Sequence, residues 1–170
     1  MQKLLIVSDS HGLTTELQMI RERHNISHNI HCGDSELNNS DPVIEDFLTV
    51  EGNCDIPGEF NVEETLMIDH LNVYITHGHL YRVKSTLLPL TYRAAEVKAD
   101  IVCFGHSHVA GTEKIDHRIY INPGSIRMPR KRTNKTYVIV SWKNHGHINV
   151  EFFDINGHII DDLSTTFSLT

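Results

Sequence analysis

Five short motifs carry the side chains of this chain that can do chemistry, and each lies beside an apolar run. They are Asp9-Ser10-His11, Gly33-Asp34, Gly52-Asn53-Cys54-Asp55, Thr76-His77-Gly78-His79 and Gly105-His106-Ser107-His108. Together they supply imidazoles, carboxylates and one amide. Imidazole binds Mn, Fe, Ni or Zn, and a carboxylate oxygen can bridge two such ions. The set therefore predicts a two-metal hydrolase site.

The elements that precede these motifs explain how they can meet. Four of the five motifs directly follow an apolar run that we interpret as a strand, and the motif at Thr76 begins on the last residue of a fifth such run. The runs are Lys3–Ser8, His28–Cys32, Phe47–Glu51, Leu71–Thr76 and Asp100–Phe104. Open α/β sheets bind ligands at the carboxyl ends of their strands. We therefore expect the motifs to share one edge of the fold.

Helices are expected between the early strands. Leu13–Arg23 places apolar residues at helical spacing, and Asp41-Pro42 is typical of a helix start leading into Val43–Phe47. A third helix is expected over Ser85–Lys98, broken near Pro89, because proline removes a backbone donor.

Later segments favour antiparallel strands. A hairpin is expected from Asn61–Ile68 and Leu71–Thr76, and residues 109–122 add one or two strands. The end of the chain predicts a meander of Thr136–Trp142, Ile148–Phe153 and Ile159–Thr165, with turns at Lys143-Asn144-His145-Gly146 and Asn156-Gly157. The predicted fold is α/β, with two mixed β-sheets packed together and flanked by helices in four layers, as one domain over residues 1–170.

Composition narrows the class of protein. The 170 residues include 39% hydrophobic and 22% charged residues, and no apolar stretch reaches the ~20 residues of a membrane span. The first apolar run is too short for a signal peptide, and the three cysteines form no Cys-x-x-Cys, so we expect a reducing cytoplasm. A net charge of −7 argues against strong nucleic-acid binding, with Arg130-Lys131-Arg132 as a local exception.

In kind and in order, the five motifs resemble those of the calcineurin-like metallophosphoesterase family. The chain is most similar to the small bacterial and archaeal phosphodiesterases of that family. This likeness rests on Gly52-Asn53-Cys54-Asp55, Thr76-His77-Gly78-His79 and Asn122-Pro123-Gly124-Ser125, and it spans residues 1–142.

The resemblance implies a ligand set for two divalent ions. Manganese is the expected metal, with iron, nickel or zinc as alternatives. One ion would be held by Asp9, His11, Asp34 and His108, and the other by Asp34, Asn53, His77 and His106, with Asp34 bridging. A metal-bound hydroxide would then attack a small phosphodiester.

Cys54 departs from the wider family, in which many members have a histidine after the asparagine. That histidine is thought to protonate the leaving group, and a thiol is a poor proton donor. We therefore expect modest rates, a preference for good leaving groups, or protonation by bound water or by His79. Covalent attack by Cys54 is the less favoured alternative. Asn53, His79 and Arg127 are candidate substrate-binding residues, whereas His31 is expected to be a hydrogen-bonded core imidazole.

Two alternatives to an enzyme of this kind stay open. A scaffold or binding module is known in the retromer subunit that shares this fold, although members of that kind have lost metal ligands. A nuclease would share the motifs but needs a nucleic-acid track, which an acidic chain of this length lacks. The substrate and any homo-oligomer are left open by the sequence.

Overall fold

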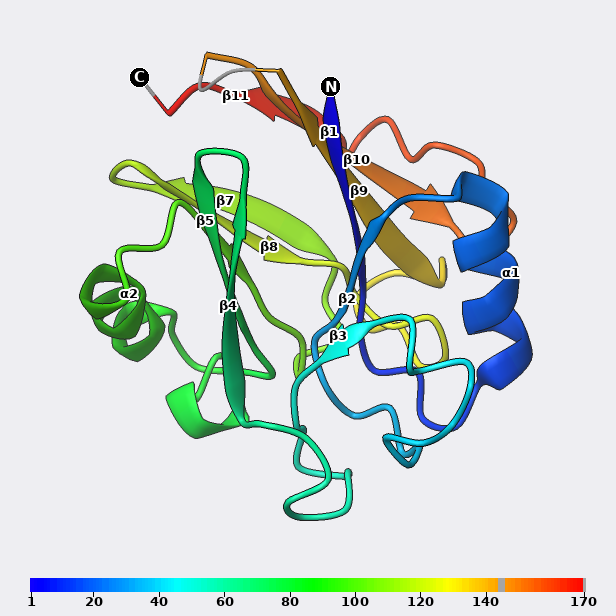
Figure 1. The fold of residues 1–170 in the computed structure, drawn as a ribbon. Coiled ribbons are helices and arrows are strands. Elements are labelled where there is room, and N and C mark those ends of the chain that lie inside the picture. Colours follow the sequence, from blue (N-terminus) through cyan, green and yellow to red (C-terminus); the bar gives the residue numbers. More distant parts are fainter. Residues whose placement is uncertain (144–145, 170) are drawn as a thin grey trace.

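The structure is a computed structural model that describes residues 1–143 and 146–169. Two β-sheets pack face to face, and a helix covers the outer face of each (Figure 1). The six-stranded sheet has the order β11-β10-β9-β1-β2-β3 and consists of β1 (Gln2–Val7), β2 (His28–His31), β3 (Leu48–Thr49), β9 (Thr136–Trp142), β10 (Ile148–Asp154) and β11 (Thr165–Phe167).

The second sheet has five strands in the order β4-β5-β6-β8-β7. These are β4 (Glu63–Ile68), β5 (Leu71–Thr76), β6 (Ile101–Cys103), β7 (Gly111–Ile115) and β8 (Arg118–Asn122). The helices are α1 (Thr14–His24), the short 3-10 helix η1 (His79–Tyr81) and α2 (Leu88–Glu96). The layers run α1, six-stranded sheet, five-stranded sheet, α2, which confirms the predicted four-layer arrangement.

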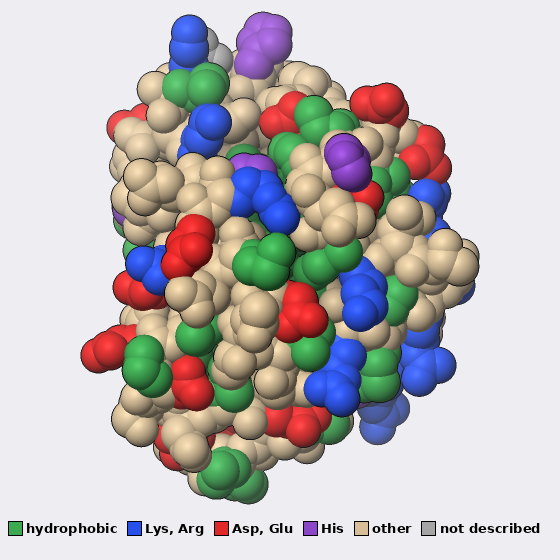
Figure 2. Space-filling model, turned by 90° about the vertical axis from the view of Figure 1, so that its right-hand side faces the viewer, with side chains coloured by type: hydrophobic (Ala, Val, Ile, Leu, Met, Phe, Trp, Pro, Cys, Tyr) green, Lys and Arg blue, Asp and Glu red, His purple; other side chains and the backbone are tan. Residues whose placement is uncertain are grey.

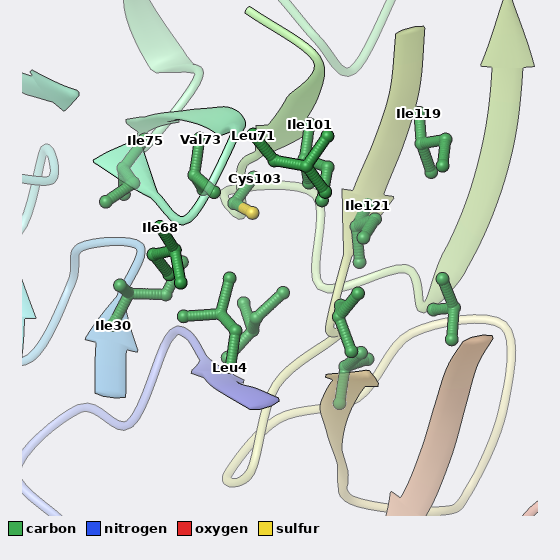
Figure 3. Packing of buried hydrophobic residues seen from close by; sticks show 14 of the residues in the cluster. Leu4, Ile30, Ile68, Leu71, Val73, Ile75, Ile101, Cys103, Ile119 and Ile121 are labelled. Atoms are coloured by element: carbon green, nitrogen blue, oxygen red, sulfur yellow. The ribbon is translucent and has the colours of Figure 1, made fainter. Parts of the chain in front are cut away.

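Strand β1 shows why its sequence is apolar throughout. Leu4 and Ile6 point into the core between the sheets, whereas Leu5 and Val7 pack with the buried face of α1. A strand covered on both faces needs apolar residues at every position. Across the core, Leu4 and Ile30 face a layer of β-branched and aliphatic side chains from the other sheet (Figure 3).

The parallel strands explain how the motifs come together. β1 pairs in parallel with β2, and β2 with β3; in the other sheet β5 pairs in parallel with β6, and β6 with β8. In Figure 1, β1 runs downwards from the N-terminus, and strands that are parallel to one another within a sheet end on the same side of it. The five motifs follow them there, as the sequence predicts.

Two predicted helices need correction. Val43–Phe47 is not a helix, and residues 42–46 form turns held by short-range bonds such as Ile44 N–H to the Asp41 carbonyl (3.1 Å). Ile44 and Phe47 are apolar because they pack beside α1. Pro89 does not break a helix but lies in the first turn of α2, where its missing N–H costs nothing.

The predicted last strand is also misplaced. Ile159 makes only an isolated bridge with Phe153, and residues 161–163 form turns before β11 begins at Thr165. Ile160 is apolar because it packs on the core between the sheets. The predicted turn at residues 143–146 includes positions 144 and 145, which lie outside the described residues, whereas that at Asn156-Gly157 is confirmed.

Among the described residues, no helix is long and apolar enough to cross a membrane. The single domain and the cytoplasmic location stay predictions. On the face that carries α1, acidic and basic side chains are interspersed, with Lys and Arg gathered towards one edge (Figure 2).

Candidate metal centre

Buried ligand atoms from both sheets converge where the parallel strands end. One group consists of Asp9, His11 and His108, and a second consists of Asp9, Asp34 and His77. Within each group, one ligand atom from every residue lies within 4.8 Å of the others. All five side chains are buried. The two groups share Asp9, so they describe two adjacent places for an ion.

Hydrogen bonds on the far side of each ring orient the histidines. The Nδ1 atom of His77 lies 2.7 Å from the Cys32 carbonyl, and that of His108 lies 2.8 Å from the Met128 carbonyl. The Nδ1 atom of His11 lies 2.5 Å from the Glu36 carboxylate. Each contact requires Nδ1 to donate, so each Nε2 is directed at the centre. Metal-binding histidines are usually held in this way.

The atoms that face one another in the centre fit a cation. Nε2 of His11 and Nε2 of His108 are 3.4 Å apart, and both carry lone pairs in the tautomers just described. Within the described part of the chain, Asp9 Oδ1 and His77 Nε2 are buried without a hydrogen-bond partner. Buried acceptors that face only other acceptors are costly, and a divalent ion among them removes that cost. The donor set therefore suits a metal.

The carboxylates give this centre a strong attraction for positive charge. Burial lowers the pKa of His77, but the Asp34 and Asp9 carboxylates outweigh burial and raise it overall. The Asp9 carboxylate, whose Oδ1 lies 3.0 Å from Nε2 of His108, likewise raises the pKa of His108. Burial raises the pKa of Asp34, but His77 and the Cys54 N–H outweigh it and hold that pKa well below its usual range.

The backbone holds both carboxylates in place. Cys54 N–H donates to Asp34 Oδ1 at 2.7 Å, while Asp9 Oδ2 accepts from Ser8 Oγ at 2.5 Å and from His106 N–H at 3.1 Å. Two glycines make room for these contacts. A Cβ at Gly52 would lie 2.1 Å from Asp34 Oδ1, and one at Gly105 would lie 2.5 Å from Asp9 Oδ2.

The loops that carry the ligands are strained. Asp9, His11, Asp34, His106 and His108 all have left-handed backbone conformations, with φ of 52°, 45°, 54°, 64° and 58°. For residues other than glycine, such conformations cost on the order of 1–3 kcal/mol each, and they concentrate at functional sites. The fold therefore sets the directions of these side chains at an energetic cost.

Asp55 has a positioning role that the sequence did not reveal. Its buried carboxylate accepts the backbone N–H groups of Asp34 (2.8 Å), Glu36 (2.7 Å) and Gly52 (2.7 Å), and also Ser35 Oγ (3.1 Å). This one side chain ties the loop after β2 to the loop after β3. The only signal in the sequence was its place at the end of the third motif.

The Asn122–Ser125 turn lies against the ligand loops. Asn122 Nδ2 donates to the Gly105 carbonyl at 3.0 Å and to Ser107 Oγ at 2.9 Å. Ser125 Oγ donates to the Asp9 carbonyl at 2.7 Å. The turn therefore supports two of the ligand loops through their backbones.

Several predicted site residues lie around the centre but outside the two groups. The ring of His106 is 5.1 Å from that of His77, and His79 is half-buried with its ring 5.4 Å from His77. Asn53 is exposed, and its amide contacts Cys54 Sγ at 3.3 Å. Arg127 donates to the His11 carbonyl.

A comparison with known families identifies the chain. The model of the calcineurin-like phosphoesterase superfamily domain matches residues 2–145. The chain belongs to this superfamily. It is 46% identical to the probable metallophosphoesterase YsnB of Bacillus subtilis over 168 residues, which is 98% of this chain and 99% of that protein.

Solved structures of this calcineurin-like superfamily share the fold. A Streptococcus pneumoniae protein described as a predicted phosphoesterase is 29% identical with a TM-score of 0.93, covering 98% of this chain and 97% of that one. The phosphoesterase YfcE of Escherichia coli has a TM-score of 0.69 at 18% identity, over 99% of this chain and 100% of its own. Zinc-complexed Vps29 from Entamoeba histolytica has a TM-score of 0.78 at 15% identity, over the same shares of the two chains.

The environment of Cys54 sets the protonation state of its thiol. Burial and the nearby Asp34 carboxylate raise the pKa of the Cys54 thiol to about 11. The side chain is therefore a neutral thiol near pH 7, which makes it a weak nucleophile. His11, Glu36 and Cys54 form a third group of close ligand atoms, two of whose members are exposed.

His31 lies close to the centre but belongs to the core. It is fully buried, with Nε2 2.9 Å from Ser10 Oγ and with Nδ1 accepting Gly33 N–H at 3.2 Å. Both nitrogens are thus used by the protein itself. The prediction of a hydrogen-bonded core imidazole is confirmed.

Proposed function

We propose that this protein is a metal-dependent phosphodiesterase that hydrolyses a small phosphodiester with two divalent ions. The observation that carries the proposal is the pair of buried ligand groups that share Asp9 and direct lone pairs at each other. Membership of the phosphoesterase superfamily supports the reaction class. The name of YsnB, probable metallophosphoesterase, supports the need for metal.

The ligand assignment combines the resemblance with this geometry. Asp9, His11, Asp34 and His108 would hold one ion, and Asp34, Asn53, His77 and His106 the other. When bound, two divalent ions lower the pKa of a shared water and neutralise charge on the phosphoryl oxygens. Two carboxylates against two such ions leave a positive centre that attracts a phosphate.

The protein's own groups then orient the diester and handle the proton. In the reaction, the water oxygen forms a bond to phosphorus and one ester P–O bond breaks, giving a monoester and an alcohol. The departing alkoxide needs a proton. His79, whose ring lies 5.4 Å from that of His77, is an imidazole outside the assigned ligand set. Burial lowers the pKa of His79, so it would have to take up a proton before donating one. Good leaving groups are therefore expected to react fastest.

Hydrolysis of two aryl phosphates tests the proposal. Protein stripped with a chelator is assayed on a bis-aryl and a mono-aryl phosphate, with and without added manganese. We expect manganese-dependent cleavage that favours the diester. His77→Ala should abolish it, whereas His117→Ala, at an exposed turn, should leave it intact. Preference for the monoester would overturn the diesterase assignment.

The same assay addresses the alternatives. Bound metal without turnover on any aryl phosphate would favour a scaffold. One fold neighbour, Vacuolar Protein Sorting 29 from Cryptosporidium parvum, is named for sorting and not for hydrolysis. Salt-sensitive binding to single-stranded DNA would favour a nuclease. Iron, nickel and zinc are assayed beside manganese because imidazole and oxygen ligands suit all four.

A further inference from the structure

A cavity of about 510 Å³ lies beside the ligand loops on the outer face of the five-stranded sheet. It is bounded by the segment before α2, the segment after β6, β7 and β8. These elements lie on the side of the molecule opposite α1 (Figure 1). Its volume is in the range of small-molecule sites, which is about 300–1,000 Å³. None of the roles proposed above uses this space.

The walls of the cavity combine rings with positive charge. Phe104 and Tyr120, both buried, supply two aromatic side chains. Three cations and one carboxylate complete the lining at exposed positions, namely Lys84, Arg130, Lys131 and Glu113. A local excess of two positive charges stands out in a chain whose net charge is −7. Such walls suit a flat ring that carries an anionic group.

The cavity adjoins the candidate metal centre at one short segment. Ser107, which lines the cavity, stands between His106 and His108 in the chain. Arg130, also in the lining, donates its N–H to the His108 carbonyl at 2.9 Å. A molecule whose phosphate lies on the ligands would have to pass only Ser107 to place its organic group in the cavity.

We infer that this cavity binds the retained organic group of the substrate, an aromatic or heteroaromatic ring bearing a second negative charge. The inference rests on the proposed function, because the ring is taken to be part of the phosphodiester that the protein hydrolyses. It narrows the substrate from any small diester to anionic diesters with an aryl-sized group. The aromatic walls recognise the ring, and Lys84 and Lys131 recognise the charge.

Three p-nitrophenyl phosphodiesters test whether the cavity binds the retained group. Their second ester group is methyl, phenyl or 4-carboxyphenyl. All three release p-nitrophenolate, so only the retained group differs. With manganese, we expect kcat/KM to rise about tenfold from methyl to phenyl and to rise again for 4-carboxyphenyl. Most of the change should lie in KM, because the cavity contacts a part of the substrate that does not react.

Two variants separate ring recognition from charge recognition. A Cβ at Gly111, which lines the cavity, meets no atom within 4 Å, so a side chain can begin there without a clash, and Gly111→Phe is chosen to fill the space. It should reduce kcat/KM for the phenyl ester to that for the methyl ester. Lys84→Ala with Lys131→Ala should remove only the gain from the carboxylate. Lys98→Ala, exposed and outside the cavity, is the matched control.

A binding measurement keeps this inference separate from the proposed function. Phenylphosphonate is titrated into chelator-treated protein, and the backbone amide signals of residues 111 and 112 are followed by NMR in the wild type and in each variant. Shifts are expected in the wild type and in His77→Ala but not in Gly111→Phe. Methyl ester hydrolysis without these shifts or any ring preference would overturn the cavity's role alone. Shifts without hydrolysis of any ester would overturn the proposed function, and with it the cavity's role in a substrate.

Discussion

At the scale of single residues, the carboxylates decide how many ions the centre holds. The resemblance makes Asp34 the bridging ligand, so Asp34→Ala is expected to remove both metals. Elemental analysis after dialysis against manganese measures this, with Asp41→Ala, half-buried and outside the ligand groups, as the control. One ion retained at full occupancy in Asp34→Ala would contradict bridging by Asp34. Asp9, common to the two buried groups, would then be the shared ligand.

Cys54 governs which leaving groups the site can release. Its thiol has a pKa of about 11 and is a weak hydrogen-bond donor, so it gives little help to a departing alkoxide. Replacing it by histidine, as in Cys54→His, should raise kcat at least about tenfold for poor leaving groups. A series of aryl esters with increasing phenol pKa measures this, with Cys54→Ser as the control. An equal change across the series would show that no acid is missing.

At the scale of elements, Asp55 connects the loops after β2 and β3. In Asp55→Asn, one oxygen becomes an NH₂ group and leaves about two buried N–H donors without an acceptor. Each such donor costs about 1–3 kcal/mol, so unfolding by urea should show a loss of about 3 kcal/mol. Metal affinity should fall as well, because Asp34 loses its backbone support. A stability like that of Asp41→Asn would refute this role.

Strand β2 should make the protein sensitive to acid through His31. Burial lowers the pKa of His31 to about 4, against the opposing effect of nearby carboxylates. The unfolded chain, with a histidine pKa of about 6.5, binds more protons between these values, so stability is lost as pH falls from 6.5 to 4. The loss should total about 3 kcal/mol in wild-type urea curves. His31→Gln should flatten the slope, whereas His28→Gln, at the half-exposed start of β2, should not.

The elements show which parts of the fold can be predicted from the sequence and which cannot. Strands such as β1 and β5 could be predicted because burial on both faces leaves continuous apolar runs. The helix predicted at Val43–Phe47 was wrong because the spacing of its apolar residues reflects packing beside α1. The site residues could be named from their motifs, but the role of Asp55 could not, since its partners are backbone groups brought near by tertiary structure.

At the scale of the whole molecule, the centre joins the two sheets. Asp9 and Asp34 follow strands of the six-stranded sheet, whereas His77 and His108 follow strands of the other. An ion bound by both sets stabilises only the folded state. At a hundredfold excess over Kd, each site adds about 2.7 kcal/mol. For a protein of this size that should raise Tm by roughly 5–10 °C per site.

Thermal unfolding with added manganese or with chelator measures this coupling. His77→Ala should show a smaller shift, because the ligand set for one ion is then incomplete. His117→Ala should shift as the wild type does. A Tm that does not respond to manganese at any concentration would show that the folded protein binds no ion.

The left-handed backbone at the ligand residues lowers the folding stability of this chain, whereas the side chains held in that conformation are needed for function. Glycine adopts that conformation without strain, so His106→Gly should relieve about 1 kcal/mol while removing an imidazole. Its N–H, which supports Asp9, would remain. A mutant library selected only for heat resistance should therefore accumulate glycine at His106, whereas one selected for hydrolysis should retain histidine there.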